Sequence, residues 1–168
     1  MNTLLAAGFL AVCAAASSPA LAQFNSVPTP LPPTAATESQ AQSEQEYRRD
    51  AARRVYESFP THIHRGKLPP LMYAIAITET DVDETGRVTD VRLTREPAAA
   101  KEVGPWVVAM LRKIGQFPAP ARLAKTTYKE IWLVDKTGKF QVDTLTEGQR
   151  SGSEPPPVAR AVAAATRR

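Results

Sequence analysis

Two alternating runs joined by a tight turn decide the fold. In order they read Tyr73-Ala-Ile-Ala-Ile-Thr-Glu-Thr-Asp-Val82, Asp83-Glu-Thr-Gly86 and Arg87-Val-Thr-Asp-Val-Arg-Leu-Thr94. Apolar residues at every second position predict β-strands. The polar turn ends in glycine, which adopts positive φ without strain, so the two strands are expected to form an antiparallel hairpin.

The alternation also assigns faces to the two strands. Tyr73, Ile75 and Ile77 point one way, and Val91 and Leu93 continue that face on the second strand. Large apolar side chains on one face of a sheet usually pack against a helix. We therefore expect these five residues to face the helix that follows.

A helix and two further strands follow the hairpin. Residues 103–114 carry an apolar stripe at helical spacing, and Gly115 marks the end of the helix. Residues 127–134 predict a third strand. The turn at residues 135–138 resembles the first turn, which makes residues 139–143 a candidate fourth strand.

The predicted fold class is α+β: a small antiparallel sheet of three to four strands packed on one main helix in the order ββαβ, with an extra N-terminal helix. The extra helix, residues 43–58, begins with Ser43 and Glu46 at the spacing of a capping box. The expected core consists of apolar residues whose period points inward: Ile75, Ile77, Val91, Val107, Met110, Leu111, Ile131 and Leu133.

The domain organisation follows from composition. Residues 1–22 predict a signal peptide cleaved after the Ala20-Leu-Ala22 pattern, with an uncleaved membrane anchor as the alternative. Residues 23–42 are rich in Pro, Ser and Thr and predict a linker without a core, residues 43–143 form the domain, and residues 144–168 are expected to be a flexible tail. The only cysteine, Cys13, lies in the signal, so no disulfide is expected in the exported protein.

The formal net charge of +4 is concentrated near the start of the domain. A solvated helix face is one interpretation of this cluster. The other is contact with an anionic surface, such as lipid headgroups or cell-wall polymer. Nucleic acid is not an expected partner of an exported protein. The cluster contains Arg48, Arg49, Arg53 and Arg54.

No motif typical of an enzyme occurs in the chain, so catalysis, a metal and a cofactor are not expected. The acidic group at Glu79, Asp81, Asp83 and Glu84 fits a solvated strand end. The two histidines, His62 and His64, lack the further ligands that a zinc site needs and are expected at the surface or in packing.

Three ordered motifs carry a family resemblance. Phe59-Pro60 precedes the first strand, Val82-Asp-Glu-Thr-Gly-Arg-Val-Thr-Asp-Val91 forms the hairpin, and Phe117-Pro-Ala-Pro120 leads from the helix to the last strand. Over residues 44–143 this order resembles the TonB C-terminal domain family of energy transducers. The resemblance implies a periplasmic domain without enzymatic activity that binds outer-membrane receptors by strand addition, as an accessory to TonB-dependent transport across the outer membrane.

The chain departs from that family in three places, one of which is the short segment of residues 23–42, where family members have a long Pro-rich spacer with charged repeats. Family members have an N-terminal membrane helix that engages an inner-membrane motor, whereas this chain has a cleavable signal; inner-membrane anchoring is therefore the alternative location. Arg95-Glu-Pro97 stands where the family has Ser-Ser-Gly. A cleaved protein could not transmit force from a motor. The alternative function is an envelope structural protein that uses the fold to bind cell-wall polymer or another domain, and a homodimer also remains open.

The resemblance implies that a partner strand pairs beside the strand that follows the helix. The backbone would supply affinity, and Tyr128 and Trp132 on one face would supply selectivity. The alternative is that residues 140–142 already occupy this edge. The candidate partner-binding residues are Tyr128, Lys129, Glu130, Ile131 and Trp132.

Overall fold

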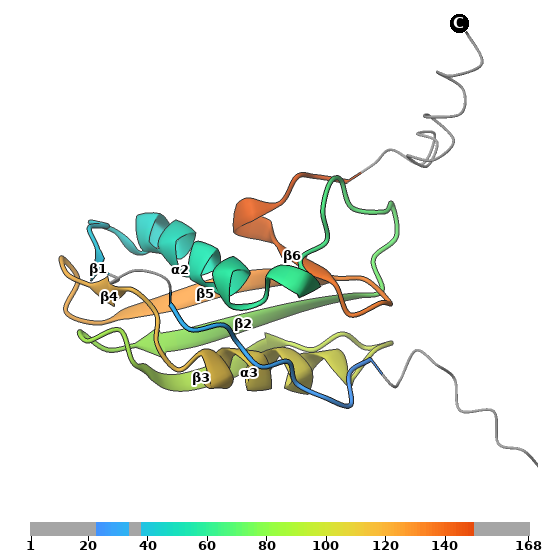
Figure 1. Ribbon diagram of the computed structural model, residues 1–168, viewed down its shortest axis with the longest axis horizontal. Helices are drawn as coiled ribbons and strands as arrows, with labels where there is room; N and C mark the ends of the chain where they lie inside the picture. Colours follow the sequence, from blue (N-terminus) through green and yellow to red (C-terminus); the bar gives the residue numbers. More distant parts are fainter. Residues whose placement is uncertain (1–22, 34–37, 150–168) are drawn as a thin grey trace, which may run out of the picture.

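The computed structural model describes residues 23–33 and 38–149, which form an α+β fold with a four-stranded antiparallel sheet and two α-helices (Figure 1). The four strands have the order β3-β2-β5-β6, and β1 and β4 form a separate parallel pair. The elements are β1 (Glu38–Ser39), α2 (Glu44–Ser58), η1 (Pro60–His62), β2 (Ala74–Val82), β3 (Val88–Arg95), α3 (Val103–Ile114), β4 (Ala119–Pro120), β5 (Thr126–Val134), β6 (Phe140–Val142) and η2 (Asp143–Leu145).

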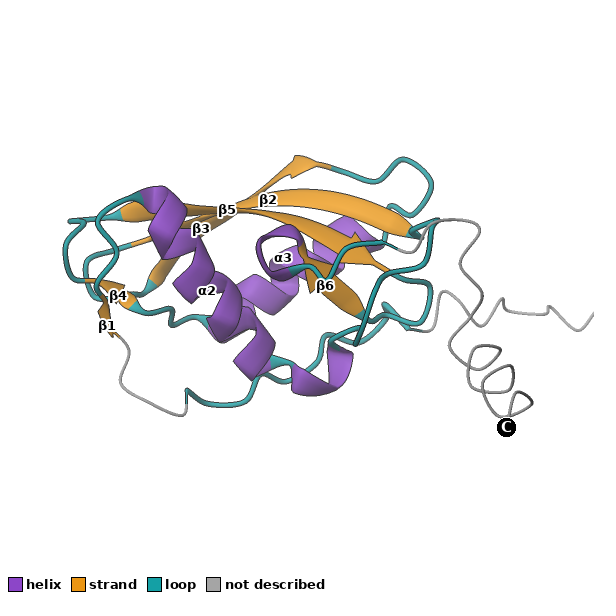
Figure 2. Ribbon diagram, turned by 90° about the horizontal axis from the view of Figure 1, so that it is seen from above, coloured by secondary structure: helices purple, strands orange, loops and turns teal. Residues whose placement is uncertain are grey.

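Helices α2 and α3 lie on one face of the sheet, and within residues 23–33 and 38–149 the other face carries no α-helix (Figure 2). Helix α2 packs over β5, and α3 packs over β3 and β2. We call the face opposite the helices the outer face. The main core lies between the sheet and the two helices, where a sheet buries its apolar side in this fold class.

The helix ends follow the expected chemistry. The Ser43 hydroxyl accepts a hydrogen bond from Glu46 N (3.3 Å), which confirms the predicted cap. The Glu46 carboxylate reaches back as expected, but it accepts from Gln42 N (2.8 Å) and not from the N-cap N–H. Helix α2 stops before Pro60, since the residue preceding a proline is pushed out of helical geometry. Helix α3 has the predicted bounds and ends at Gly115, whose φ is 64°.

The two hairpin turns share one hydrogen-bond pattern. In the first turn a single Asp83 carboxylate oxygen accepts bonds from Thr85 N (2.9 Å), the Thr85 hydroxyl (2.6 Å) and Arg87 N (2.9 Å). Asp135 repeats the pattern in the second turn. An aspartate that binds its own turn in this way explains why both four-residue sequences form hairpins.

Gly86 joins the first hairpin to the end of α3. Its φ is 85°, and its carbonyl accepts a hydrogen bond from Phe117 N (2.8 Å). A Cβ at this position would lie 2.2 Å from the Phe117 carbonyl oxygen. Glycine is therefore required both by the backbone conformation and by the close approach of the chain that leaves the helix.

The predicted inward faces of β2 and β5 are wrong. The small residues of β2, from Ala74 and Ala76 to Thr80, point toward the helices and are buried. On β5 the fully buried side chains are Tyr128, Glu130, Trp132 and Val134. Ile75, Ile77, Ile131 and Leu133 are half-buried on the outer face, whereas Val91, Val107, Met110 and Leu111 are buried as predicted.

Complementary volumes on the two strands explain this arrangement. Ala76 lies opposite Trp132, and Thr80 lies opposite Tyr128. Small side chains on the central strand leave room for the large aromatic rings beside them and for the helices above, which permits a close-packed interior. The Trp132 indole N–H also donates to the Thr78 hydroxyl (3.0 Å), so that its polar atom is satisfied.

The segments on either side of the domain are packed where the structure describes them. The expected linker contributes Phe24 to the core, edge-on to Trp106 with ring centroids 5.2 Å apart, and residues 23–33 run along α3 and past α2 (Figure 1). The expected tail is also packed at first, since Leu68 N donates to the Gly148 carbonyl (2.8 Å). The prediction that both segments lack packing is therefore wrong at residues 23–33 and 144–149.

Two further observations concern the ends of the chain. The predicted signal peptide, residues 1–22, and residues 150–168 lie outside the described residues. Among the helices of residues 23–33 and 38–149, none has the length and apolar character that crossing a membrane requires.

Candidate functional site

Strand β5 is central in the sheet and not at its edge. It pairs with β2 along its whole length, from Thr126 to Val134. On its other side β6 pairs only with Trp132, Leu133 and Val134. In the part of the chain that the structure describes, residues 126–131 thus have a strand partner on one side only. The alternative that residues 140–142 occupy this edge is correct for the C-terminal third of β5.

The five predicted partner-binding residues divide between the two faces. Tyr128, Glu130 and Trp132 are fully buried beneath the helices. Lys129 is exposed and Ile131 is half-buried on the outer face. The expectation that Tyr128 and Trp132 present their rings to a partner is therefore wrong, because both rings belong to the core.

The Glu130 carboxylate is the centre of a buried polar network. Its Oε1 accepts hydrogen bonds from Arg48 Nη2 (2.8 Å), Ile131 N (3.0 Å) and Thr144 N (3.4 Å). Its Oε2 accepts the Tyr128 hydroxyl (2.9 Å). A buried carboxylate needs such partners, because desolvation without them is costly. The network links α2, β5 and η2 at the open part of β5.

Burial and charge act on the pKa values of this network. Burial is the main cause that raises the pKa of Tyr128 well above its usual value, and the neighbouring Glu130 charge adds to the effect. Burial lowers the pKa of Arg48, but its hydrogen bond to Glu130 and the charges of Glu130 and Asp143 outweigh burial, so this pKa lies above its usual value. Tyr128 thus stays neutral and Arg48 stays charged at physiological pH.

Glu130 also occupies one of the backbone N–H groups along the open part of β5. In an antiparallel ladder the N–H and C=O groups of one residue point to the same side, and successive residues alternate. Because Ile131 N–H is bound by the Glu130 side chain, it points away from β2, and Lys129 N–H points the same way. Glu130 therefore caps one of the backbone donors that an added strand would need.

The four arginines of the predicted basic cluster are not equivalent. Arg48 binds Glu130, and Arg54 is buried and donates to the Gln116 carbonyl (3.1 Å). Arg53 lies at the surface beside Asp50, with 2.9 Å between nitrogen and oxygen. Two of the four arginines thus bind groups inside the domain, which leaves a smaller basic surface than the sequence indicates.

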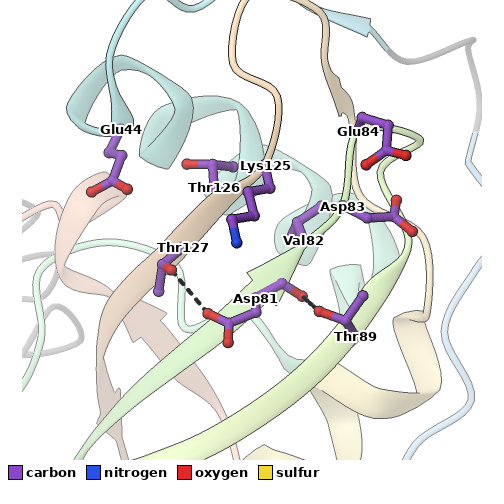
Figure 3. A pocket seen from close by; sticks show the side chains of 9 residues that line it. All are labelled: Glu44, Asp81, Val82, Asp83, Glu84, Thr89, Lys125, Thr126 and Thr127. Carbon is purple, nitrogen blue, oxygen red and sulfur yellow. Dashed lines mark hydrogen bonds between the residues drawn. The ribbon is translucent and has the colours of Figure 1, made fainter.

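A pocket of about 360 Å³ lies at the C-terminal end of β2, beside the first residues of the open part of β5, and three of the four predicted acidic residues line it: Asp81, Asp83 and Glu84 (Figure 3). Asp81 accepts the Thr127 hydroxyl (2.9 Å) and is bound by Arg92, whose hydrogen bond holds the Asp81 pKa below its usual value. Asp83 is held ionised chiefly by the Thr85 hydroxyl. Both carboxylates therefore remain charged, and neither has the raised pKa that a general acid requires.

The histidines have separate environments. His64 Nδ1 lies 2.9 Å from an Asp135 carboxylate oxygen, and the His62 ring lies 6.4 Å from the Trp106 ring. Burial lowers the pKa of His62, and the Lys139 charge lowers it further. Residues 23–33 and 38–149 contain no group of three His, Cys, Asp or Glu side chains placed to hold a metal ion.

Sequence reasoning missed the Arg48–Glu130 pair. A signal was present, because Glu130 shares its strand face with two aromatic residues, Tyr128 and Trp132. A lone carboxylate on an aromatic strand face indicates either a solvent face or a buried charge with a distant partner. Only the tertiary fold brings Arg48 within reach, 82 positions away in the sequence.

Comparisons of the chain with protein-family models, curated proteins and solved structures found no match. The candidate site consists of the open part of β5, residues 126–131, and of the Glu130 network that caps it.

Proposed function

We propose that this chain is a non-enzymatic binding domain of the periplasm that takes up a strand of a partner protein beside β5. The resemblance to the TonB C-terminal domain family names the partner class, which is a segment of an outer-membrane receptor or transporter. The observation that carries the proposal is that, in the described part of the chain, residues 126–131 have a strand partner on one side only. Cleavage of residues 1–22 belongs to the proposal, and an exported protein that keeps Met1 would contradict this part.

An added strand would continue the edge that β6 leaves open. Backbone groups at Lys129 and Ile131 would supply hydrogen bonds, and the partner would replace Glu130 as the acceptor for Ile131 N–H. Outward side chains of the partner would lie beside Lys129 and Ile131. Selectivity is thus assigned to these two residues instead of the buried Tyr128 and Trp132.

Catalysis is not part of the proposal, because the ionisable groups near β5 are already bound by structural partners. Glu130 is shared among four donors, and Asp81 is paired with Arg92. Strand addition needs none of them to change protonation. It needs only an accessible backbone edge.

The test is an NMR titration of the chain with extended peptides copied from the periplasmic segments of outer-membrane receptors. We expect amide shifts at residues 129–131, and we expect Lys129→Pro to abolish them, because proline removes an outward N–H without removing a ladder bond to β2. Lys129→Ala is the matched control: it removes the same side chain but keeps the N–H, so it should change the selectivity among peptides while the amide shifts at residues 129–131 persist.

Two outcomes would contradict the proposal. In one, Lys129→Pro binds as tightly as Lys129→Ala, while unchanged tryptophan indole signals show that the proline variant is folded. In the other, the shifts are confined to the exposed Arg49 and Arg53 surface of α2, a result that would instead favour an envelope protein that binds an anionic polymer.

A further inference from the structure

Four aliphatic side chains form a patch on the outer face of the sheet. Ile75 lies directly opposite Leu133, and Ile77 lies directly opposite Ile131. We call these four residues the outer apolar patch. All four are half-buried, and both helices lie on the other face (Figure 2). This cluster offers an aliphatic surface on which a further segment of the chain can pack.

The patch continues into charged positions along the same strands. The next pair is Glu79 with Lys129, and Arg92 lies beside Glu79 and Asp81. Asp90 is also bound to Arg92. Lys125 also acts on Asp81, so three carboxylates and three cations lie at this end of the outer face and their charges balance. The face is thus apolar at one end and charged at the other.

The chain leaves the described domain at the apolar end of this face. Gln149 forms a parallel bridge with Leu68, and its side-chain nitrogen lies 3.4 Å from the Pro69 carbonyl oxygen. Gln141 lies directly opposite Leu133 of the patch, and its side-chain oxygen accepts a hydrogen bond from Glu147 N (3.1 Å). Residues 147–149 therefore lie close to the Leu133 end of the outer apolar patch.

The sequence after Gln149 contains a segment whose pattern matches this face. Residues 150–157 are Arg-Ser-Gly-Ser-Glu-Pro-Pro-Pro, a stretch that can span up to about 26 Å when extended. Beyond it, apolar residues recur at the i, i+3, i+4, i+7 spacing of one helix face, and the arginines fall outside this face. The apolar positions are Val158, Ala161, Val162 and Ala165, and the arginines are Arg160, Arg167 and Arg168.

The spacing of Val158 and Val162 along a helix matches the spacing of the two residue pairs along the strands of the patch. Four residues of a helix rise about 6.0 Å, and two residues of a strand advance about 6.6–6.8 Å. If Val158 contacts the pair of Ile75 and Leu133, Val162 reaches the pair of Ile77 and Ile131. One further turn brings Arg168 to the level of the charged end.

We propose that residues 158–168 dock as a short helix on the outer apolar patch, with Arg168, which flanks the apolar side of that helix, toward Glu79 and Asp81. The direction is fixed by the exit of the chain at Gln149. The docked segment would cover the outer face of the sheet and would leave the open part of β5 accessible, since strand addition occurs at an edge and not on a face. The inference does not depend on the proposed function.

The test is methyl NMR of the 168-residue chain, with Val158→Asp/Val162→Asp compared with Ala159→Asp/Ala163→Asp. Both pairs add two carboxylates at the same spacing, but only the first pair lies on the apolar side of the proposed helix. We expect the first variant to shift the methyl signals of Ile75, Ile77, Ile131 and Leu133. The control variant should leave these signals near their positions in the unaltered chain.

The readout separates docking from loss of the fold, because the indole signals of the buried Trp106 and Trp132 report the core. Patch signals that are the same in both variants, with the indoles unchanged, would overturn the proposal. Patch signals that move with protein concentration in the unaltered chain would also overturn it and would identify a second copy of the chain as the occupant.

Discussion

Replacing Glu130 by glutamine should be among the most destabilising single changes in the sheet. The substitution keeps the shape of the side chain and removes its charge, while the Arg48 guanidinium remains 2.8 Å away. Breaking one side of a buried ion pair typically costs about 3–5 kcal/mol. Arg48 keeps 31% of its side chain exposed and can be partly rehydrated, so we expect a loss near the lower end, about 3 kcal/mol.

Urea unfolding of the chain measures this loss. With a slope of about 1–3 kcal/mol per molar urea for a small domain, the midpoint should fall by roughly 1–3 M. Glu79→Gln is the matched control, because Glu79 lies on the outer face of the same sheet and pairs with Lys129 at 3.3 Å in partly exposed surroundings. That control should cost less than about 1 kcal/mol.

A double-mutant cycle of Glu130→Gln and Arg48→Gln measures the coupling free energy between the two side chains. Residues in one hydrogen-bonded network are coupled, so the double variant should lose less than the sum of the two single losses, by roughly 0.5–3 kcal/mol. Equal midpoint changes for Glu130→Gln and Glu79→Gln would refute the reasoning, because they would mean that the Glu130 charge is not buried.

Two further predictions concern the hairpin turns. Gly86→Ala should destabilise the domain more than Gly138→Ala: both glycines have positive φ, but a Cβ at residue 86 would lie 2.2 Å from a carbonyl oxygen, whereas at residue 138 its nearest neighbour lies 3.7 Å away. Equal thermal midpoints for the two variants would contradict the idea that the Phe117 carbonyl leaves no room for a Cβ at residue 86. Asp135→Asn should destabilise more than Asp83→Asn at pH 7, because Asp135 also binds a histidine. Burial raises the pKa of Asp135, but its hydrogen bonds outweigh burial and hold this pKa below its usual value. The carboxylate therefore contributes stability above the unfolded pKa of about 3.9, and this contribution is lost as the pH falls through the lower folded pKa. Urea midpoints should accordingly differ between unaltered chain and Asp135→Asn at pH 7 and converge below about pH 4; a difference that stays constant to pH 2 would show that the charge is not involved.

The local structure of this protein is determined by its sequence. Helix α3 has the predicted bounds because its apolar stripe, its basic last turn and Gly115 all indicate the same segment. The Ser43 cap of α2 and the two aspartate turns were predicted for the same reason. In each case the interactions that decide the structure lie within a few residues of one another, so a short window of sequence contains them.

The tertiary structure decided which side of the sheet is the inside. Alternation separates the residues of β2 and β5 into two sets, but both sets are apolar enough to be buried, and a period of two does not say which set faces the helices. The choice depends on volumes contributed by distant elements: small residues such as Ala76 lie beside Trp132, and two helices cover that side. The same long-range packing places Arg48 against Glu130 and Phe24 against Trp106, contacts that no short window of sequence contains.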